Sequence, residues 1–383
     1  ETHQGAYEAL EALLRAREGH GALRDLYRRR ADVTFNQREQ KQLLSRIIEL
    51  SRTELDDRAT AIATAEELLD LIPDDLPTLE LLVEMYERGQ TRSELAKLEE
   101  ALGRWAELER DPARARGLTV RRATLRMQEL GDAYGATDLL GQVLGEDPDN
   151  ASARALLEEL LGVSEVQLAA AAMLEPVYIR SGDHAGRIRV LSIRREQAEN
   201  QGSIDQAITH LLEVVRLLEI DMGDRNGAFA TAREAYAMDA RRADTRNEVE
   251  RLGLELGAYA DLVTTWRDAL DQVGTDTSLR IGLLRRIAEL QDGKLRDPDA
   301  ARKAWSDLLA LDPPDVALAQ RCVEALCRLH LESGDGPALV EAKRALLRFV
   351  SSDDAGVRIR LEIAEIQEQL GVALGRVEHP REP

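Results

Sequence analysis

Residues 286–313, RIAELQDGKLRDPDAARKAWSDLLALDP, carry the hydrophobic pattern that organises the whole chain. Ala301, Trp305 and Leu308 recur at the spacing of one helix face, and we expect them to form a buried apolar stripe. Pro313 follows the stripe and cannot continue a helix, so it marks the helix end. The pattern therefore predicts a helix, a tight turn and a second helix packed back against the first.

The same stripe and stop recur three more times along the chain. The copies are Ala61, Ala65, Leu68 and Pro73; Ala136, Leu140, Val143 and Pro148; and, with alanine in place of proline, Ala228, Ala232, Ala235 and Ala240. Successive stop positions lie 75, 92 and 73 residues apart. Chance does not place four copies in register, so we infer an internal repeat, in which each hairpin buries its stripe against the next copy.

A short polar turn precedes each second helix. The turns are Asp56-Asp57, Gly131-Asp132, Gly223-Asp224 and Arg296-Asp297. In the last of these, Asp297 can cap the helix and Pro298 stands in the first turn, where a missing N–H costs no hydrogen bond. Three of the four repeats also carry one additional residue before the turn.

An apolar first helix precedes each turn, and a further helix pair follows three of the four copies. The first-helix positions are Leu44, Ile47 and Ile48; Leu211, Val214 and Val215; Leu284, Ile287 and Ala288; and, more weakly, Val120, Ala123 and Met127. In the following pairs we expect Leu95 and Leu98, Leu262 and Trp266, and Leu339 to face inward. One unit is then four helices in about 75 residues, and the 92-residue interval leaves room for another helix or hairpin within 181–206.

The predicted fold is all-α: a right-handed α-solenoid of stacked antiparallel helix hairpins. We expect one continuous array over residues 1–376 and a tail over 377–383. Residues near the N-terminus, with Leu23 and Tyr27, match the third and fourth helices of a unit, and VRIRLEIAEIQEQLG matches a first helix, so the array is expected to begin and end within a unit. Bends are expected near 110–118 and 181–205, where the pattern is least regular. Pro176 either lies within a helix or opens one after Glu175.

Composition supports a helical, acidic protein. The 383 residues are 44% hydrophobic and 3% aromatic, and no segment approaches the ~18 apolar residues of a membrane-crossing helix. The net charge of −20 repels phosphate backbones and anionic lipid, which disfavours nucleic-acid and membrane-surface roles. Cys322 and Cys327 are five apart on one helix, too far for a disulfide, which suits a reduced cytoplasmic setting. The chain does not begin with Met, so export is not excluded.

The hairpins resemble tetratricopeptide repeats. The resemblance rests on the small, bulky and apolar stripe, the stopping proline and the preceding turn, and it covers almost the whole chain. First helices lack the family's usual aromatic and glycine positions, so the chain looks more like the long, divergent arrays of large bacterial proteins. The family generally binds peptides or partner helices in a concave groove lined by first helices. The fold hosts many roles, so the resemblance does not identify a partner.

By register, the groove-facing candidates are charged or polar residues of the first helices. They are Glu49, Arg52, Arg121, Gln128, Arg216, Glu219, Arg285 and Glu289. The alternative is that these side chains are ordinary solvated charges, partly paired along the helices. The family's Lys/Asn clamp for C-terminal carboxylates has no counterpart among them, which disfavours chaperone-tail binding.

The sequence predicts neither catalysis nor a cofactor. Cys327 and His330 share a helix face but have no further metal-ligating companion, so buried structural cysteines are expected. P-loop, GxSxG and strand-linked GxGxxG motifs are missing. The tryptophans, Trp105, Trp266 and Trp305, are expected in the hairpin core, and the arginine-rich segments LYRRRAD and VRRATLR read as solvated faces or as sites for an acidic peptide.

Two functions follow as hypotheses. The first is a non-catalytic scaffold that binds protein or peptide partners through the groove. The alternative is a regulatory or recruiting segment of a larger multidomain enzyme, which sequence flanking these residues would reveal. Helical-repeat RNA recognition is a third reading, and it would need a basic groove.

Overall fold

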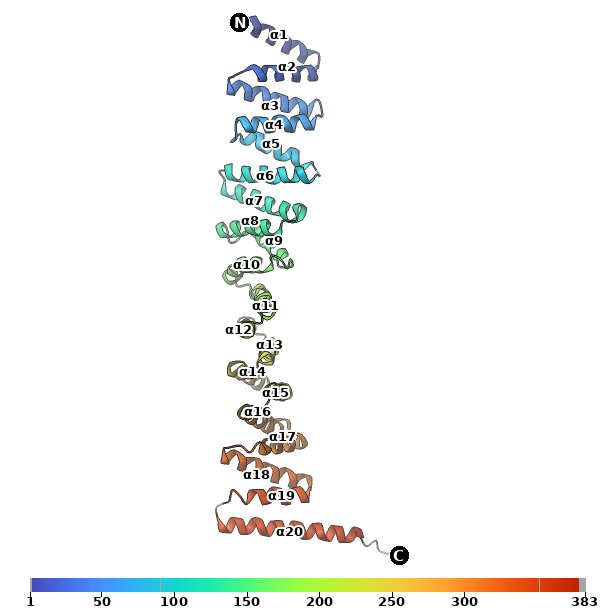
Figure 1. The fold of residues 1–383 in the computed structure, drawn as a ribbon, viewed down its shortest axis with the longest axis vertical. Coiled ribbons are helices and arrows are strands. Elements are labelled where there is room, and N and C mark those ends of the chain that lie inside the picture. Colours follow the sequence, from blue (N-terminus) through green and yellow to red (C-terminus); the bar gives the residue numbers. More distant parts are fainter. Residues whose placement is uncertain (1, 90, 351, 379–383) are drawn as a thin grey trace. The chain divides into compact units, whose positions relative to one another are not determined.

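The computed structural model describes residues 2–89, 91–350 and 352–378, and side chains within 4–89, 91–350 and 352–371. Over these residues the chain is all-α, with helices and no strand (Figure 1). The chain divides into two compact units, Glu1–Val190 and Leu191–Pro383, and each is described by itself. Each unit is a stack of helix hairpins, a tetratricopeptide-like helical repeat. The continuity of the array and its right-handed course stay predictions.

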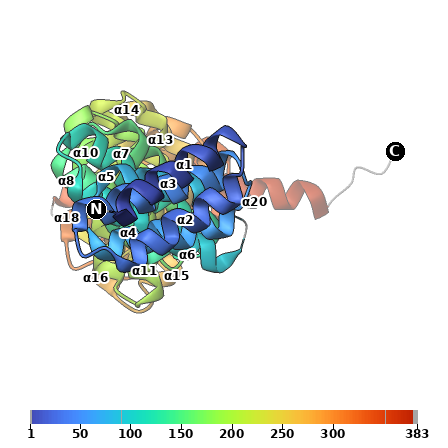
Figure 2. The same ribbon diagram turned by 90° about the horizontal axis from the view of Figure 1, so that it is seen from above.

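The first unit follows the chain in hairpin order. Its elements are α1 (Thr2–Ala16), α2 (His20–Val33), α3 (Gln37–Thr53), α4 (Arg58–Leu71), α5 (Leu76–Glu87), α6 (Arg92–Leu108), α7 (Pro112–Leu125), the π-helical turn η1 (Arg126–Leu130), α8 (Ala133–Glu146), α9 (Ala151–Leu160) and α10 (Gln167–Ser181). Seen from above, α1, α3 and α5 lie on one side and α2, α4 and α6 on the other (Figure 2). We call these two sets the first helices and the second helices, and α7, which leads the hairpin formed with α8, is also a first helix.

Helix α11 (His184–Asn200) spans the boundary between the units. The second unit continues with α12 (Ile204–Arg216), η2 (Leu217–Asp221), α13 (Arg225–Met238), α14 (Ala243–Leu256), α15 (Tyr259–Gln272), α16 (Thr277–Leu290), η3 (Gln291–Leu295), α17 (Pro298–Ala310), α18 (Val316–Ser333), α19 (Gly336–Leu346) and α20 (Asp353–Glu378). Here α12, α14, α16 and α18 are first helices, and α13, α15, α17 and α19 are second helices. Helix α11 is the additional element expected within 181–206, and it accounts for the longest repeat interval.

The four predicted turns share one backbone conformation. Their leading residues, Asp56, Gly131, Gly223 and Arg296, all have positive φ, at 50°, 69°, 70° and 54°. The aspartate that follows then caps the second helix; Asp297, for example, accepts a hydrogen bond from the Ala300 N–H at 3.0 Å. Its own N–H closes a wide turn on the Gln291 carbonyl at 3.0 Å. A left-handed residue followed by an aspartate therefore both ends one helix and starts the next.

Three first helices end in a π-helical turn, as η1, η2 and η3. A π turn holds one residue more than an α turn, so it absorbs an added residue without breaking the helix. The sequence expectation of an additional residue in three repeats has this structural counterpart. The π turns carry Gln128 and Glu219, two of the groove candidates.

The predicted stripes form the core. All twelve stripe side chains, of which Trp305 and Val143 are the most accessible, are at most 2% exposed. Trp266 is also buried, at 1%, whereas Trp105 is only partly covered. The weaker first helix, α7 with η1, buries Ala123 but leaves Val120 of α7 and Met127 of η1 partly exposed. Burial of the stripe between neighbouring helices supplies the main stabilisation of each hairpin.

Pro176 lies inside α10, one of the two alternatives that the sequence left open, and the helix therefore lacks one main-chain N–H donor at that position. The segments in which bends are expected are largely helical, since Pro112 opens α7 and α11 occupies most of 181–205. A bend of the array at these segments stays a prediction. Residues 377–378 of the expected tail belong to α20, and 379–383 lie outside the described residues.

Candidate partner-binding site

The structure places all eight groove candidates on first helices or their π turns. Glu49 and Arg52 are on α3, Arg121 on α7, Gln128 on η1, Arg216 on α12, Glu219 on η2, and Arg285 and Glu289 on α16. The residues separate into two groups of four. One group is tied to a neighbouring first helix by an ion pair, and the other is exposed and makes no ion pair with a described residue.

The four residues of the tied group form ion pairs between successive first helices, and we call each of these pairs a rung. Arg52 reaches Glu84 of α5 at 3.2 Å, Glu289 pairs with Arg321 of α18 at 3.1 Å, Glu219 contacts Arg251 of α14 at 2.6 Å, and Arg121 pairs with Glu87. Such exposed pairs individually contribute little, roughly 0–1 kcal/mol, but they fix side-chain positions. These four residues therefore serve the packing of one hairpin on the next.

Glu219 shows the strongest such rung. Its two carboxylate oxygens accept from the Arg251 guanidinium at 2.8 and 2.6 Å, and its side chain is 17% exposed. The hydrogen bond from Arg251 lowers the pKa of Glu219, more than burial raises it. A bidentate contact of this kind sets the position of Glu219 on the first-helix side.

The exposed group is available to a ligand. Glu49, Gln128, Arg216 and Arg285 are exposed, and their own side chains make no hydrogen bond or ion pair with another described residue. In the second unit, both of these residues are arginines, on α12 and α16. The first-helix face of that unit therefore presents two uncommitted positive charges on a chain whose net charge is −20.

A cavity of about 600 Å³ opens on the same face, between α16 with η3 and α18. Trp305 of the second helix α17 also lines this cavity. Its indole N–H donates a hydrogen bond to the Asp292 carboxylate at 3.3 Å. Arg328 donates to both oxygens of Asp292, at 2.6 and 2.5 Å. The Arg321 guanidinium lies 6.0 Å from the centre of the Trp305 ring.

This cavity is polar and its charges are held in place. Asp292 is 19% exposed, fixed by Arg328 and Trp305, while Glu324 also lines the opening. Guanidinium donors and carboxylate acceptors together match the polar groups of a peptide segment. Sequence reasoning found Glu289 but missed Asp292, Arg321 and Arg328. Trp305 was a sequence feature that could have indicated this cavity, because the other repeats have the smaller residues Ala65, Leu140 or Ala232 at its position.

The other sequence candidates have structural partners. Arg28 pairs with Glu67, and Arg30 with Glu39 at 2.9 Å. Arg122 and Arg126 both donate to Glu99. The arginine-rich segments therefore pair within the chain at several positions.

The cysteines lie on α18 as free thiols. Cys322 is buried and Cys327 is partly covered. Burial raises the pKa of the Cys322 thiol to about 11. His330 lies 3.7 Å from an Asp335 carboxylate oxygen. Within the described residues, no group of three or more His, Cys, Asp or Glu side chains is arranged to hold a metal ion. Helices with both the length and the apolar character to cross a membrane are likewise not found there.

Comparisons with known proteins give structural likenesses only. No protein-family model matches the chain, and no curated protein matches it. The crystal structure of the P58(IPK) TPR domain matches over 96% of this chain and 98% of that one, with 11% identity and a TM-score of 0.24. Naa15/Naa10 bound to HypK-THB matches over 95% and 66%, with 13% identity and a TM-score of 0.33. The human IFIT1 dimer with m7Gppp-AAAA matches over 88% and 71%, with 13% identity and a TM-score of 0.30.

TM-scores of this size carry no argument about function. The assignment of a tetratricopeptide-like repeat rests on the hairpins, the buried stripes and the four equivalent turns of the chain itself.

Proposed function

We propose that this chain is a non-catalytic scaffold that binds a protein partner through the first-helix face of its second unit. The observation that supports this most is the pairing pattern there. Glu219 and Glu289 are committed to neighbouring helices, whereas Arg216 and Arg285 are exposed on the same set of helices as the Trp305 cavity. A partner segment that supplies carboxylates would meet these arginines with charge complementarity.

Recognition of this kind is spread over several repeats. Each exposed arginine contributes one solvent-accessible contact, and such contacts are individually weak. Reversal of a single charge should therefore cost little, and reversal of several should abolish binding. In this proposal the partner is a protein and not a nucleic acid, as the net charge of −20 favours, and the setting is cytoplasmic.

The experiment is affinity capture from a lysate of the source cell, followed by mass spectrometry. The native chain is compared with an Arg216→Glu/Arg285→Glu double variant. The matched control is Lys303→Glu/Arg344→Glu, which reverses two exposed cations on the second helices α17 and α19. The proposal expects a protein captured by the native chain and the control but not by the double variant, with equal helicity by circular dichroism. Identical capture by all three chains would refute groove binding.

A further inference from the structure

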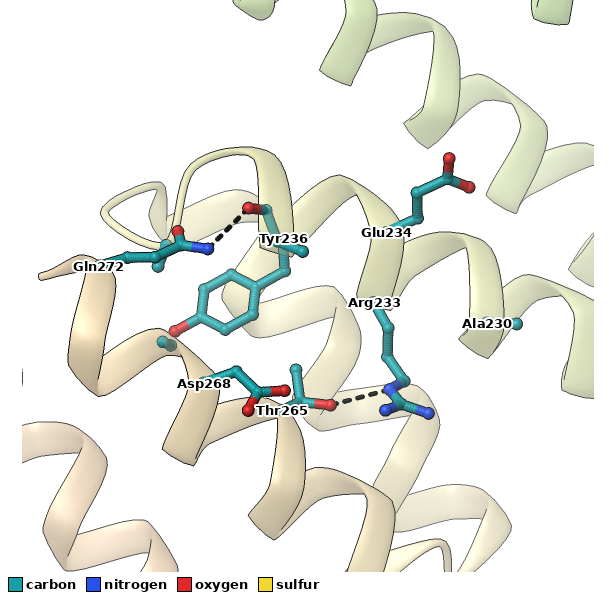
Figure 3. A pocket seen from close by; sticks show the side chains of 10 residues that line it. Ala230, Arg233, Glu234, Tyr236, Thr265, Asp268 and Gln272 are labelled. Atoms are coloured by element: carbon teal, nitrogen blue, oxygen red, sulfur yellow. Dashed lines mark hydrogen bonds between the residues drawn. The ribbon is translucent and has the colours of Figure 1, made fainter.

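An apolar pocket of about 290 Å³ lies on the second-helix side of the second unit, between α13 and α15 (Figure 3). Its floor is formed by the Tyr236 ring, Ala240 and Ala269, which are at most 3% exposed. Ala230 and Ala237, both exposed, stand at its mouth. The pocket is separate from the groove residues and from the Trp305 cavity.

Two hydrogen bonds frame the pocket. Arg233 Nε donates to the Thr265 hydroxyl at 2.8 Å, and the Gln272 side-chain amide donates to the Ala237 carbonyl at 2.9 Å (Figure 3). Both bonds join α13 to α15. They hold the two helices together on either side of a space that no side chain fills.

The pocket is bordered by small side chains. Ala230, Ala237, Ala240 and Ala269 line it, and Ala240 stands where the other three copies of the stripe have proline. Alanine methyl groups are too short to fill the gap between α13 and α15. The apolar hollow therefore comes from alanines of both helices and of the segment that follows α13.

The corresponding space in the first unit is different. Between α4 and α6, Glu66 pairs with Lys97 at 2.5 Å, and Glu100 and Arg104 line the opening. Charged side chains occupy that space. The apolar character therefore distinguishes the α13–α15 pocket from the equivalent α4–α6 space.

Charge at the rim limits what can enter. Arg233 is held by Thr265 and Asp261, and Glu234 pairs with Arg195. Asp268 lines the pocket, is exposed and makes no ion pair with another described residue. The rim therefore offers one uncommitted carboxylate beside an apolar floor.

We propose that this pocket receives one branched apolar side chain of a partner peptide, with an adjacent cation of that peptide held by Asp268. Transfer of apolar surface from water into the alanine-lined floor drives insertion. The carboxylate of Asp268 selects a basic neighbour over an acidic one. The site lies on the second helices, so this proposal can be tested independently of the proposal that a partner binds the first-helix face.

The probe is isoamylammonium, which joins a leucine-like branched chain to a cation. Titration into the full chain, labelled with 13C at alanine methyl groups, follows the Ala240 and Ala269 signals by NMR. We expect saturable shifts of these two signals. Ethylammonium, which carries the cation without the branched chain, should not give them.

Two variants test the pocket, one serves as a control and one tests the carboxylate of Asp268. Ala240→Leu fills the floor and should abolish the shift of the Ala269 signal; Ala237→Leu covers the mouth from an exposed position, so it serves if the first variant does not fold. Ala260→Leu, at an exposed alanine of α15, should leave binding unchanged. Asp268→Asn should weaken isoamylammonium at least threefold and leave isoamyl alcohol unaffected.

The proposal is overturned if isoamylammonium causes no saturable shift of the Ala240 and Ala269 signals in the native chain. It is also overturned if the Ala269 signal shifts equally after the pocket is filled or covered. Equal responses to isoamylammonium in the native and Asp268→Asn chains would overturn the role of the carboxylate.

Discussion

Glu219 and Arg251 form a bidentate ion pair between η2 and α14, with oxygen–nitrogen distances of 2.8 and 2.6 Å. Arg52 and Glu84 stand 167 positions earlier in the chain, the same interval that separates Asp224 from Asp57. They also form an ion pair, at 3.2 Å, with the signs reversed. Equivalent positions of the repeat thus keep the rung between first helices while exchanging its charges.

This relationship predicts unequal effects of charge reversal. Arg52→Glu should lower the free energy of unfolding by about 0.5 kcal/mol, because both partners are substantially exposed. Arg251→Glu should cost about 2 kcal/mol, because Glu219, Glu248 and Glu255 all contact that guanidinium. Urea denaturation measures both values. Adding Glu84→Arg to the Arg52→Glu chain should restore stability, and no recovery would show that this pair is not a rung.

The turns predict a pair of opposite effects. Arg296 has a φ of 54° and occupies the position that Gly131 and Gly223 take in other repeats. Arg296→Gly should therefore raise the free energy of unfolding by up to about 1 kcal/mol, because glycine adopts this conformation without strain.

Gly131→Ala should lower the free energy of unfolding by about 1 kcal/mol. No atom lies within 4 Å of the Cβ that alanine would add, so the cost is conformational. Thermal denaturation of both variants checks the pair. A stabilising Gly131→Ala would contradict the account of the turn.

A partly buried carboxylate, that of Glu99, predicts a pH dependence in the first unit. Burial raises the pKa of Glu99, but hydrogen bonds from Arg126 at 2.6 Å and Arg122 at 2.5 Å outweigh it, so its pKa is lowered. A carboxyl group whose folded pKa is lower than its unfolded value of about 4.3 stabilises the fold fully above that value. This contribution is lost as the pH falls through the lower folded pKa.

Glu99→Gln should accordingly cost about 1–3 kcal/mol at pH 7, and the difference from the native chain should shrink at pH 3–4. Urea denaturation over a pH series provides the measurement. Glu129→Gln, at an exposed position of η1, is the control and should have little effect at any pH. A Glu99→Gln difference that stays constant from pH 7 to pH 3 would rule out the ionised form as the stabilising one.

Removal of the hydroxyl group from each of two buried tyrosines should have contrasting effects on stability. The Tyr86 hydroxyl donates to Glu66, whereas the Tyr236 hydroxyl is buried with no hydrogen-bond partner among the described residues. Tyr86→Phe should lower the free energy of unfolding by about 1 kcal/mol, and Tyr236→Phe should leave it unchanged or raise it. Chemical denaturation of the two variants decides the contrast, which a similar loss in both would contradict.

The sequence was sufficient to predict a helical-repeat fold, because each feature of the repeat depends on residues that are close together in the chain. Stripe, stop and turn are each encoded within about 30 residues. The stripes from Ala61 to Leu308 are buried, and the extra helix α11 lies where the long interval predicted it. Pro176 was left open because the sequence does not show whether neighbouring contacts compensate a missing donor.

The site could be predicted only in part. Register placed all eight groove candidates on first helices, but it could not separate Arg285, which is exposed, from Glu289, which pairs with Arg321. That separation depends on the rotation of α16 against α18, and pairing across hairpins has no fixed sequence spacing. The pocket beside Tyr236 could not be predicted, because it is lined by α13 and α15 together and only Ala240 among its residues belongs to the repeat pattern.

The central claim is that a partner occupies the first-helix face of the second unit. The most direct test is photo-crosslinking in the source cell, with p-benzoylphenylalanine placed at Arg285 or, as a control, at Arg344 of the second helix α19, away from the α13–α15 pocket. Both positions are exposed. The account predicts a crosslinked protein from position 285 and none from position 344. The same protein crosslinked with equal yield from both positions, or from 344 alone, would contradict it.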